Sequence, residues 1–376
     1  MTVYKRTACK SIIETSPSRT ASDSDSYSKI SFFEPPSTIQ TFSIDRQYSP
    51  ALIIIIIIII MSRILSLGIG NMGAALARTL LASNPSSPLT IWNRTADRPL
   101  VKALTAAGAH FQGDVAAAIA ASDIILICVL DYDTIYSALS PLADSSSVLA
   151  GKTIVNLTNG TPRQAAAAQA WFRERGVARY FDGAVMVTPQ LVGTPHAFLL
   201  FSGETEAAFR SRVASPLASV GKALYTGEDV ASAATEDVAA LAAMYGMFSG
   251  AFIGMGLVKR QLARAAAADT KKEGSSGSAA NVKVTPSVES VMIPMLTALV
   301  PYVALIAKAV DEEAWDDDMG NPLGMQLAGV RNILQACKDE GVNGGALETL
   351  AGLMQKVVDD RGGAGGVPEV ARFILE

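Results

Sequence analysis

The sequence predicts an α/β fold in which a doubly wound parallel sheet is followed by a domain built of helices alone. Three observations support this prediction. Short apolar runs alternate with alanine-rich stretches from residue 63 to about residue 225, a GxGxxG motif follows the first apolar run, and strand patterns stop after Tyr225. Alternating strands and helices are typical of a parallel sheet covered on both faces.

Composition narrows the function classes. The 376 residues suffice for about two domains, and 49% hydrophobic with 18% charged residues excludes a disordered chain. The net charge of −4 comes without a Lys/Arg block, so we expect no nucleic-acid partner. Three scattered cysteines and only two histidines indicate no metal site and favour a reduced, cytoplasmic compartment.

The first 60 residues differ from the rest. Residues 1–50 are rich in Ser, Thr and Pro, and eight isoleucines follow at Ile53–Ile60. This apolar run is much shorter than the roughly 20 residues that span a bilayer. We predict that residues 1–60 are a disordered leader outside the fold, preceding a true start at Met61; a membrane-tethering segment is the alternative.

The elements after residue 60 follow in a clear order. Strand patterns cover residues 63–67, 89–92, 124–129, 153–156, 180–184, 197–201 and 222–225, with helical patterns at 73–83, 162–175 and 204–212. These define a nucleotide-binding domain over residues 61–225. Helical patterns alone make up residues 226–376, at 229–268, 287–314, 322–340, 346–360 and 368–375. A polar, Gly/Ser-rich insertion at residues 269–278 predicts a flexible loop.

The GxGxxG motif lies between a strand and an alanine-rich helix, which is the context that a Rossmann dinucleotide site requires. Gly68 permits the tight turn, Gly70 admits the pyrophosphate, and Gly73 lets the helix pack close to the strand. Asn71 and Met72 lie between them, where the helix N-terminus offers free N–H groups to phosphates. A plain glycine turn is the simpler alternative.

The end of the second strand predicts the kind of dinucleotide. NAD-binding versions place a carboxylate about twenty residues after the last glycine. This chain has Asn93, Arg94, Thr95 and, further on, Arg98. Because arginine pairs with a 2′-phosphate and a carboxylate repels it, we predict NADP(H). Ordinary surface arginines are the alternative.

Two further segments end strands at the same edge of the sheet. Val129 and Leu130 should line the nicotinamide-ribose path, because ligands lie outside strand C-termini. Residues 156–162 contain Asn156, Thr158 and Asn159 ahead of a proline. These polar residues predict either contacts to the nicotinamide side of the cofactor or simple helix capping.

A carboxylate stands out on the first long helix. Asp237 shares one helical face with Leu241, Met244, Tyr245 and Phe248. A carboxylate among apolar neighbours is costly unless it is paired, protonated or functional. Burial raises a carboxyl pKa, which suits a proton donor. Capping of the helix N-terminus is the alternative interpretation.

Together these motifs resemble the imine reductases, especially the fungal reductive aminases, within the β-hydroxyacid dehydrogenase superfamily. The resemblance covers residues 63–376 and rests on residues 68–73, 93–95, 156–162, 182–190, 237–246 and 322–326. It implies NADPH-dependent reduction of an imine, or of a ketone together with an amine. The hydroxyacid branch carries Lys and Asn where this chain has Asp237 and Leu241. A carboxylate attracts a cationic iminium that an ammonium repels.

The resemblance also implies the roles of individual residues. Asp237, assisted by the Tyr245 hydroxyl, stabilises or protonates the nitrogen, while Asn159, or less favourably Asn156, holds the nicotinamide ribose or the substrate. Glu236 stands where many members have an aromatic residue. The implied assembly is a homodimer with intertwined helices and no membrane association. The implied substrate pocket contains Met186, Gln190, Met244, Met325 and Gln326, the last two reaching into the partner's site.

Two other functions remain open at this point. One is an NADP-dependent hydroxyacid dehydrogenase or aldehyde-acid reductase, for which the missing Lys is the contrary observation. The other is a non-catalytic NADP(H)-binding sensor, which predicts that a protein group neutralises Asp237.

Overall fold

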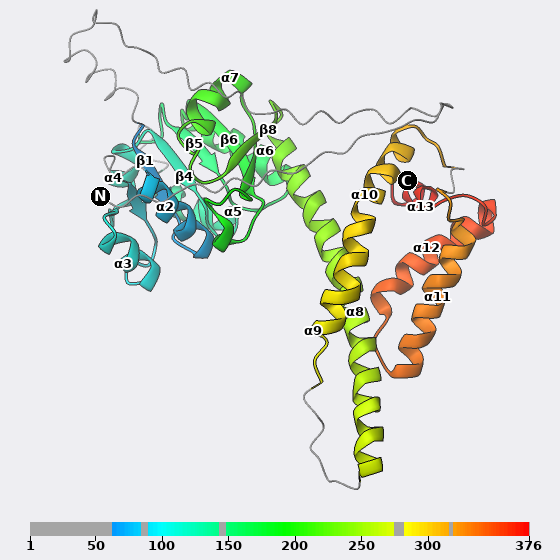
Figure 1. Cartoon of the computed structure of the whole chain (residues 1–376). Coiled ribbons are helices and arrows are strands. Elements are labelled where there is room, and N and C mark those ends of the chain that lie inside the picture. Colours follow the sequence, from blue (N-terminus) through cyan, green and yellow to red (C-terminus); the bar gives the residue numbers. More distant parts are fainter. Residues whose placement is uncertain (1–61, 84–88, 143–147, 274–281, 316–318, 376) are drawn as a thin grey trace, which may run out of the picture. The chain divides into compact units, whose positions relative to one another are not determined.

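The computed structural model describes residues 62–83, 89–142, 148–273, 282–315 and 319–375, so the predicted leader lies outside the described residues. In the described part, the strands form one sheet in the order β3-β2-β1-β4-β5-β6-β7-β8 (Figure 1). The order reverses beside β1, as in a doubly wound fold. The strands are β1 (Ile64–Leu67), β2 (Thr90–Trp92), β3 (His110–Phe111), β4 (Ile124–Ile127), β5 (Thr153–Asn156), β6 (Arg179–Val185), β7 (Phe198–Ser202) and β8 (Lys222–Gly227).

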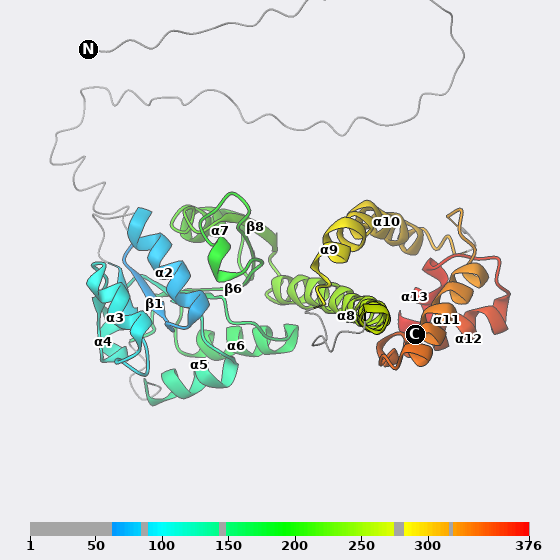
Figure 2. The ribbon, with the colours of Figure 1, turned by 60° about the horizontal axis from the view of Figure 1, so that its bottom comes forward.

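Helices cover both faces of this sheet, as the sequence predicts (Figure 2). On β4, Ile124 and Leu126 pack in one cluster, while Ile125 and Ile127 pack in the other. A strand buried on both faces reads as a continuous apolar run. One cluster takes side chains from α2 (Asn71–Ser83), α3 (Pro99–Ala106) and α7 (Glu206–Phe209); the other takes them from α4 (Val115–Ala120), α5 (Tyr132–Leu139) and α6 (Pro162–Glu174).

The sheet is not parallel throughout, which corrects the sequence prediction. β7 runs antiparallel to β6, with Asp182 opposite Ser202. The chain between them contains only the single turn η2 (Pro189–Leu191) rather than a crossover helix. A parallel pair usually needs a crossover helix, and the connection without one returns the chain in the opposite direction. β8 is again parallel to β7.

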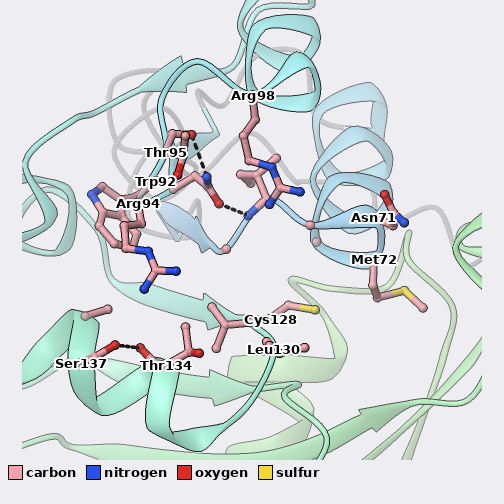
Figure 3. Close-up of a pocket in the computed structure, with 17 residues that line it drawn as sticks. Asn71, Met72, Trp92, Arg94, Thr95, Arg98, Cys128, Leu130, Thr134 and Ser137 are labelled. Atoms are coloured by element: carbon pink, nitrogen blue, oxygen red, sulfur yellow. Dashed lines mark hydrogen bonds between the residues drawn. The ribbon is translucent and has the colours of Figure 1, made fainter.

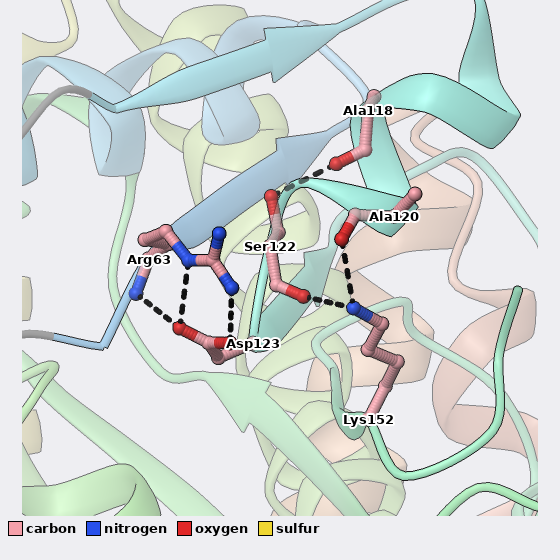
Figure 4. A network of polar contacts seen from close by, with 6 residues as sticks. All are labelled: Arg63, Ala118, Ala120, Ser122, Asp123 and Lys152. Atoms are coloured by element: carbon pink, nitrogen blue, oxygen red, sulfur yellow. Dashed lines mark hydrogen bonds and ion pairs between the residues drawn. The ribbon is translucent and has the colours of Figure 1, made fainter. Parts of the chain in front are cut away.

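A polar network fastens the amino ends of the central strands, at the edge opposite the glycine motif (Figure 4). The Arg63 backbone N–H and guanidinium both donate to Asp123, at 2.9–3.1 Å. The Lys152 ammonium donates to the carbonyls of Ala120 and Ser122. This network joins the starts of β1, β4 and β5.

The C-terminal region is helical, as predicted. α8 (Ala231–Glu273) contacts β6, β7, β8 and α6, and further along it contacts α11 and α12. It continues through residues 269–273, where the sequence predicted a loop; residues 274–278 of that insertion lie outside the described part. A separate core unites Leu323, Leu327, Met354 and Val357. The remaining helices are α9 (Thr285–Ser287), η4 (Val288–Met292), α10 (Ile293–Asp311), α11 (Leu323–Glu340), α12 (Gly345–Arg361) and α13 (Pro368–Leu375).

Candidate active site

A pocket of about 460 Å³ lies at the carboxyl ends of β1, β2 and β4. This is where the strand order reverses and where ligands bind in open α/β sheets. Its walls come from the loops that follow these three strands and from α5. The lining residues are Gly68, Ile69, Gly70, Asn71, Met72, Gly73, Trp92, Asn93, Arg94, Thr95, Arg98, Cys128, Val129, Leu130, Thr134, Ser137 and Ala138.

The three glycines of the motif have three different surroundings. Gly68 has a φ of +99°, and a Cβ there would lie 2.3 Å from the carbonyl oxygen of Cys128. A Cβ on Gly73 would lie 2.0 Å from the Gly68 carbonyl oxygen, so only glycine permits this helix–strand contact. A Cβ on Gly70 would meet nothing within 4 Å, because it would project into open space. An opening of this kind leaves room for a pyrophosphate to reach backbone N–H groups.

The residues that follow β2 either hold the loops together or are open to a ligand (Figure 3). The Asn93 side chain accepts a hydrogen bond from the Ile69 N–H at 2.9 Å and donates to the Thr95 carbonyl at 2.8 Å. Asn93 therefore ties the glycine loop to the second-strand loop. Arg94 and Arg98 are exposed residues of the lining, and a 2′-phosphate between them would meet two guanidinium groups.

The far wall of the pocket includes residues that the sequence analysis missed. Thr134 and Ser137 project from α5, on the side of the pocket towards which Arg94 points (Figure 3). Trp92, Cys128 and Ala138 are further lining residues that the sequence analysis missed. The missed signal was the N-cap of α5, because the Asp131 carboxylate accepts from the Thr134 N–H.

Of the residues predicted after β4 and β5, Leu130 is the most open, with 85% of its side chain exposed. Thr158 is buried and does not line the pocket. Its hydroxyl accepts a hydrogen bond from the Val129 N–H at 3.2 Å. Thr158 therefore acts on the pocket through the Val129 backbone.

Asp237 and Asn159 meet although 78 residues separate them. The Asn159 amide donates to Asp237 Oδ2 at 2.6 Å. Asp237 is 7% exposed, and burial raises the pKa of its carboxyl, while the Asn159 hydrogen bond acts in the opposite direction. Its neutral amide partner leaves the carboxylate charge uncompensated. A sensor with a neutralised Asp237 predicts a cationic partner, which this hydrogen bond does not supply.

The two asparagines of the same segment point to different surroundings. Asn156 is fully buried, and its amide donates to the Tyr180 hydroxyl and to Asp182. Asn159, by contrast, is exposed and reaches α8. This arrangement favours Asn159 as the asparagine available to a ligand. The capping alternative for this segment applies to Thr161, which forms a capping box with Gln164 at the start of α6.

The remaining residues of the α8 face are more open than the sequence analysis expected. Tyr245 is 63% exposed and Phe248 is 38% exposed. Eight residues of helix separate Tyr245 from Asp237 by about 12 Å along the axis. The Tyr245 hydroxyl therefore requires an intervening substrate to act together with the carboxyl group.

The residues predicted for the substrate pocket lie on three separate segments. Met186 packs against a cluster that includes Ala233, one turn before Asp237 on α8. Gln190 is exposed in η2, and Met244 is half-buried on α8. On α11, Met325 is 60% exposed and the Gln326 amide donates to the Asn321 carbonyl.

Two family models match most of the chain. The model described as the NAD binding domain of 6-phosphogluconate dehydrogenase matches residues 63–245. The model described as the C-terminal domain of NADPH-dependent reductive aminase-like proteins matches residues 229–375. The two matches meet on α8, which carries Asp237.

Individual proteins are similar over nearly their whole length. The chain is 35% identical over 301 residues to the NADPH-dependent reductive aminase of Aspergillus oryzae, covering 80% of this chain and 92% of that protein. The reductive aminase of Aspergillus terreus, solved with NADPH4, cyclohexanone and allyl amine, has 32% identity and a TM-score of 0.71, covering 83% of this chain and 99% of that one. The imine reductase of Myxococcus stipitatus with NADP+ has 28% identity and a TM-score of 0.69, covering 83% and 99%.

Proposed function

Because the chain belongs to the family of NADPH-dependent reductive aminases, we propose that it reduces imines to amines with NADPH. The observation that carries this proposal is the nearly buried Asp237 carboxyl at the carboxyl edge of the sheet, whose hydrogen-bond partner among the described residues is the neutral Asn159 amide. A carboxyl group in that position attracts a cationic iminium nitrogen.

The cofactor proposal rests on the pocket. NADPH supplies the hydride when it is bound. The backbone at Gly70 and Asn71 holds its pyrophosphate, and Arg94, Thr95 and Arg98 hold the 2′-phosphate. Val129 and Leu130 then continue the pocket along the end of β4, and Thr158 fixes the backbone there.

Asp237 changes its protonation state during the reaction. A raised pKa favours the protonated carboxyl, which gives its proton to the imine nitrogen and so forms an iminium. The resulting carboxylate pairs with the iminium, which the hydride of a bound NADPH would convert to the neutral amine, and a proton from water then restores the Asp237 carboxyl. Asn159 orients the carboxyl through Oδ2. Tyr245, further along α8, binds the far side of the substrate or its nitrogen.

The relatives suggest the wider substrate class. The A. terreus reductive aminase was solved with a ketone and an amine together. We propose that this chain also holds a ketone and an amine close enough to condense, since proximity alone raises effective concentration strongly. Met186, Gln190 and Met244 supply its side of a mainly apolar pocket, to which Met325 and Gln326 of a second copy add.

The full-length protein tests this function directly. NADPH oxidation should be followed with a cyclic imine and with a ketone plus a small amine, and NADP+ reduction with a 3-hydroxyacid. Turnover of the imine, with no hydroxyacid oxidation, is the expected result. Hydroxyacid oxidation without imine turnover would return the chain to the dehydrogenase branch. NADPH binding without any turnover would favour the sensor.

We propose that a second copy of the chain covers the apolar faces of α8 and α10. Of the residues in α10, only Ala309 is buried, although the helix is rich in aliphatic side chains. Val300 and Val303 are 64% and 65% exposed, and Phe252 on α8 is 66% exposed. Apolar surface of this extent marks an interface rather than a monomer surface.

A bilayer is the competing occupant of these faces. Helices Ala231–Ala268 and Thr285–Asp311 are long and apolar enough to cross a membrane, with mean hydropathies of 1.6 and 2.0. However, the first turns of α8 pack on β6, β7 and β8, and Asp237 there is bonded to Asn159. This attachment favours a protein partner.

Light scattering coupled to gel filtration separates the two occupants. We expect a dimer that becomes a monomer in Phe252→Glu and Val303→Glu, whereas Lys102→Glu on α3 serves as a surface control. Flotation of the wild-type protein with phospholipid vesicles, or a wild-type monomer in solution, would contradict the dimer.

We further propose the domain division at residues 225/226 and a cytoplasmic location. Cys128 and Cys337 are free thiols, as in a reducing compartment. Fractionation of cells of the source organism, with an antibody to this chain, tests the location; recovery in a membrane or secreted fraction would contradict it.

A further inference from the structure

A buried carboxyl group that the mechanism above does not use lies beneath the proposed site. Asp182 is 2% exposed on β6, in register with Asn156 on β5. Its Oδ1 accepts three hydrogen bonds: from the Tyr132 hydroxyl at 2.8 Å, the Tyr180 hydroxyl at 3.2 Å and the Asn156 amide at 3.2 Å. We call these four residues the Asp182 cluster. All four are at most 2% exposed.

The Asp182 cluster holds the loop that carries Asn159. The side-chain oxygen of Asn156 accepts from the Thr158 N–H at 3.1 Å, which fixes the turn just before Asn159. On the other side of Asn159, a Cβ on Gly160 would lie 2.2 Å from the Tyr132 ring. The ring therefore packs directly against the loop backbone, and its hydroxyl ends on Asp182.

The chain of contacts ends at Asp237. The loop presents the Asn159 amide, which donates to Asp237 Oδ2 at 2.6 Å. Asp182 thus reaches Asp237 through Asn156, the loop backbone and the Asn159 amide.

The groups that act on the Asp182 carboxyl come from four elements of the fold. Acting on Asp182 are Tyr132 from α5, Asn156 from β5, Tyr180 from its own strand and Asp237 from α8, with no cation among them in the described part. On β7, the facing Ser202 hydroxyl donates to the Val230 carbonyl instead. Burial raises the pKa of Asp182 to about 7, and the three hydrogen bonds oppose that rise. On α8, Glu236 precedes Asp237 and is exposed.

We propose that Asp182 is a positioning residue for the reaction at Asp237, because it fixes the loop that presents Asn159. This rests on the function proposed above, in which Asp237 gives a proton to the imine nitrogen. The Asn159 hydrogen bond lowers the pKa of Asp237, so a loop that no longer presents Asn159 lets Asp237 hold its proton to higher pH.

Asp182→Asn tests the proposal, because it keeps the shape but replaces the carboxyl group that accepts three hydrogen bonds by a weaker acceptor, the amide oxygen. In the full-length protein, we expect kcat/KM for a cyclic imine to fall about tenfold, while the NADPH Kd stays within about twofold, since the Asp182 cluster does not line the cofactor pocket. The alkaline limb of the kcat/KM profile should move to higher pH, by about half a unit or more, because the weakened Asn159 hydrogen bond no longer lowers the pKa of Asp237.

A measurement without substrate separates this proposal from the proposed function. Carbon-13 NMR of aspartate-labelled protein, with the Asp237 resonance assigned from Asp237→Asn, follows the titration of that carboxyl directly. Its midpoint should be higher in Asp182→Asn than in the wild type, because the Asn159 hydrogen bond that lowers the pKa of Asp237 is weakened. If the wild type reduced no imine, the proposed function would fail, and this titration would still decide the role of Asp182.

Two further variants keep the test decisive. Tyr132→Phe keeps the ring against Gly160 but removes one donor to Asp182 and so loosens the cluster that holds the Asn159 loop. The Asp237 midpoint should again rise, and this variant replaces Asp182→Asn if that protein does not fold. Ser122→Ala removes a buried hydrogen bond to the Ala118 carbonyl at the opposite edge of the sheet, and should lower Tm without moving the midpoint. An unchanged midpoint in folded Asp182→Asn or Tyr132→Phe would overturn the proposal, even if kcat/KM fell.

Discussion

Replacing Gly73 by alanine should damage both the fold and the cofactor cradle. The added Cβ would lie 2.0 Å from the Gly68 carbonyl oxygen, where ordinary contact begins at 3.4 Å. The helix and the loop must therefore separate by about 1.4 Å, the difference between these distances. Overpacking of this kind costs about 1–3 kcal/mol, which corresponds to a Tm loss of roughly 2–5 °C at an unfolding entropy of about 2.1 cal/mol/K per residue.

The same displacement moves the backbone N–H groups away from the pyrophosphate. Hydrogen bonds to charged groups contribute about 1.5–3 kcal/mol each, so the loss of one raises the NADPH Kd at least about tenfold. The assay combines thermal unfolding with a fluorescence titration of NADPH. Gly70→Ala is the matched comparison: its Cβ meets nothing within 4 Å, so Tm should hold while the methyl group obstructs the cofactor. Wild-type Tm and Kd in Gly73→Ala would refute this reasoning.

Three further predictions follow from other parts of the structure. Arg94→Ala with Arg98→Ala should raise the NADPH Kd by about 10–100-fold and leave the NADH Kd unchanged; equal losses for both cofactors would exclude a 2′-phosphate site. Asp123→Asn removes the ion pair with Arg63, whose guanidinium holds the pKa of Asp123 below its ordinary value of 3.8; the pair therefore stabilises the fold fully above that value and progressively less as pH falls below it. Because both side chains are about half exposed, the Tm difference at pH 7 should not exceed about 4 °C and should vanish in acid; a larger difference, or one that persists in acid, would contradict it. Tyr245→Phe should lower kcat for a cyclic imine about tenfold at unchanged NADPH Kd, and an unchanged kcat would remove Tyr245 from the site.

The sequence predicts the sheet where strands are long or fully apolar. The sequence analysis predicted β4 because all four of its residues are aliphatic, and the structure buries all four. By contrast, β3 has only two residues, which pair with β2. Two residues are too few to show an alternating or apolar pattern, so the sequence analysis did not predict this strand. The short helices α4 and α5 were missed, although Asp114 and Asp131 cap them. The antiparallel β7 depends on the path of the connection after β6, which periodicity does not encode.

For the candidate site, the sequence predicted individual residues but not their contacts. Helical spacing singled out Asp237, and position after a strand singled out Asn159. Their hydrogen bond depends on how α8 packs against the sheet, which is tertiary information. Asp182 begins the 182–190 motif on which the family resemblance rests. The hydroxyl that donates its shortest hydrogen bond belongs to Tyr132, in a helix that the sequence analysis did not predict.

The central claim is that the Asp237 carboxyl carries out the proton transfer in imine reduction. Single-turnover oxidation of bound NADPH by a saturating cyclic imine, compared between the wild type and Asp237→Ala, tests it most directly. We predict a rate at least about 100-fold lower in the variant, with NADPH affinity unchanged because Asp237 does not line the cofactor pocket. A variant that transfers hydride within a few-fold of the wild-type rate would contradict the account.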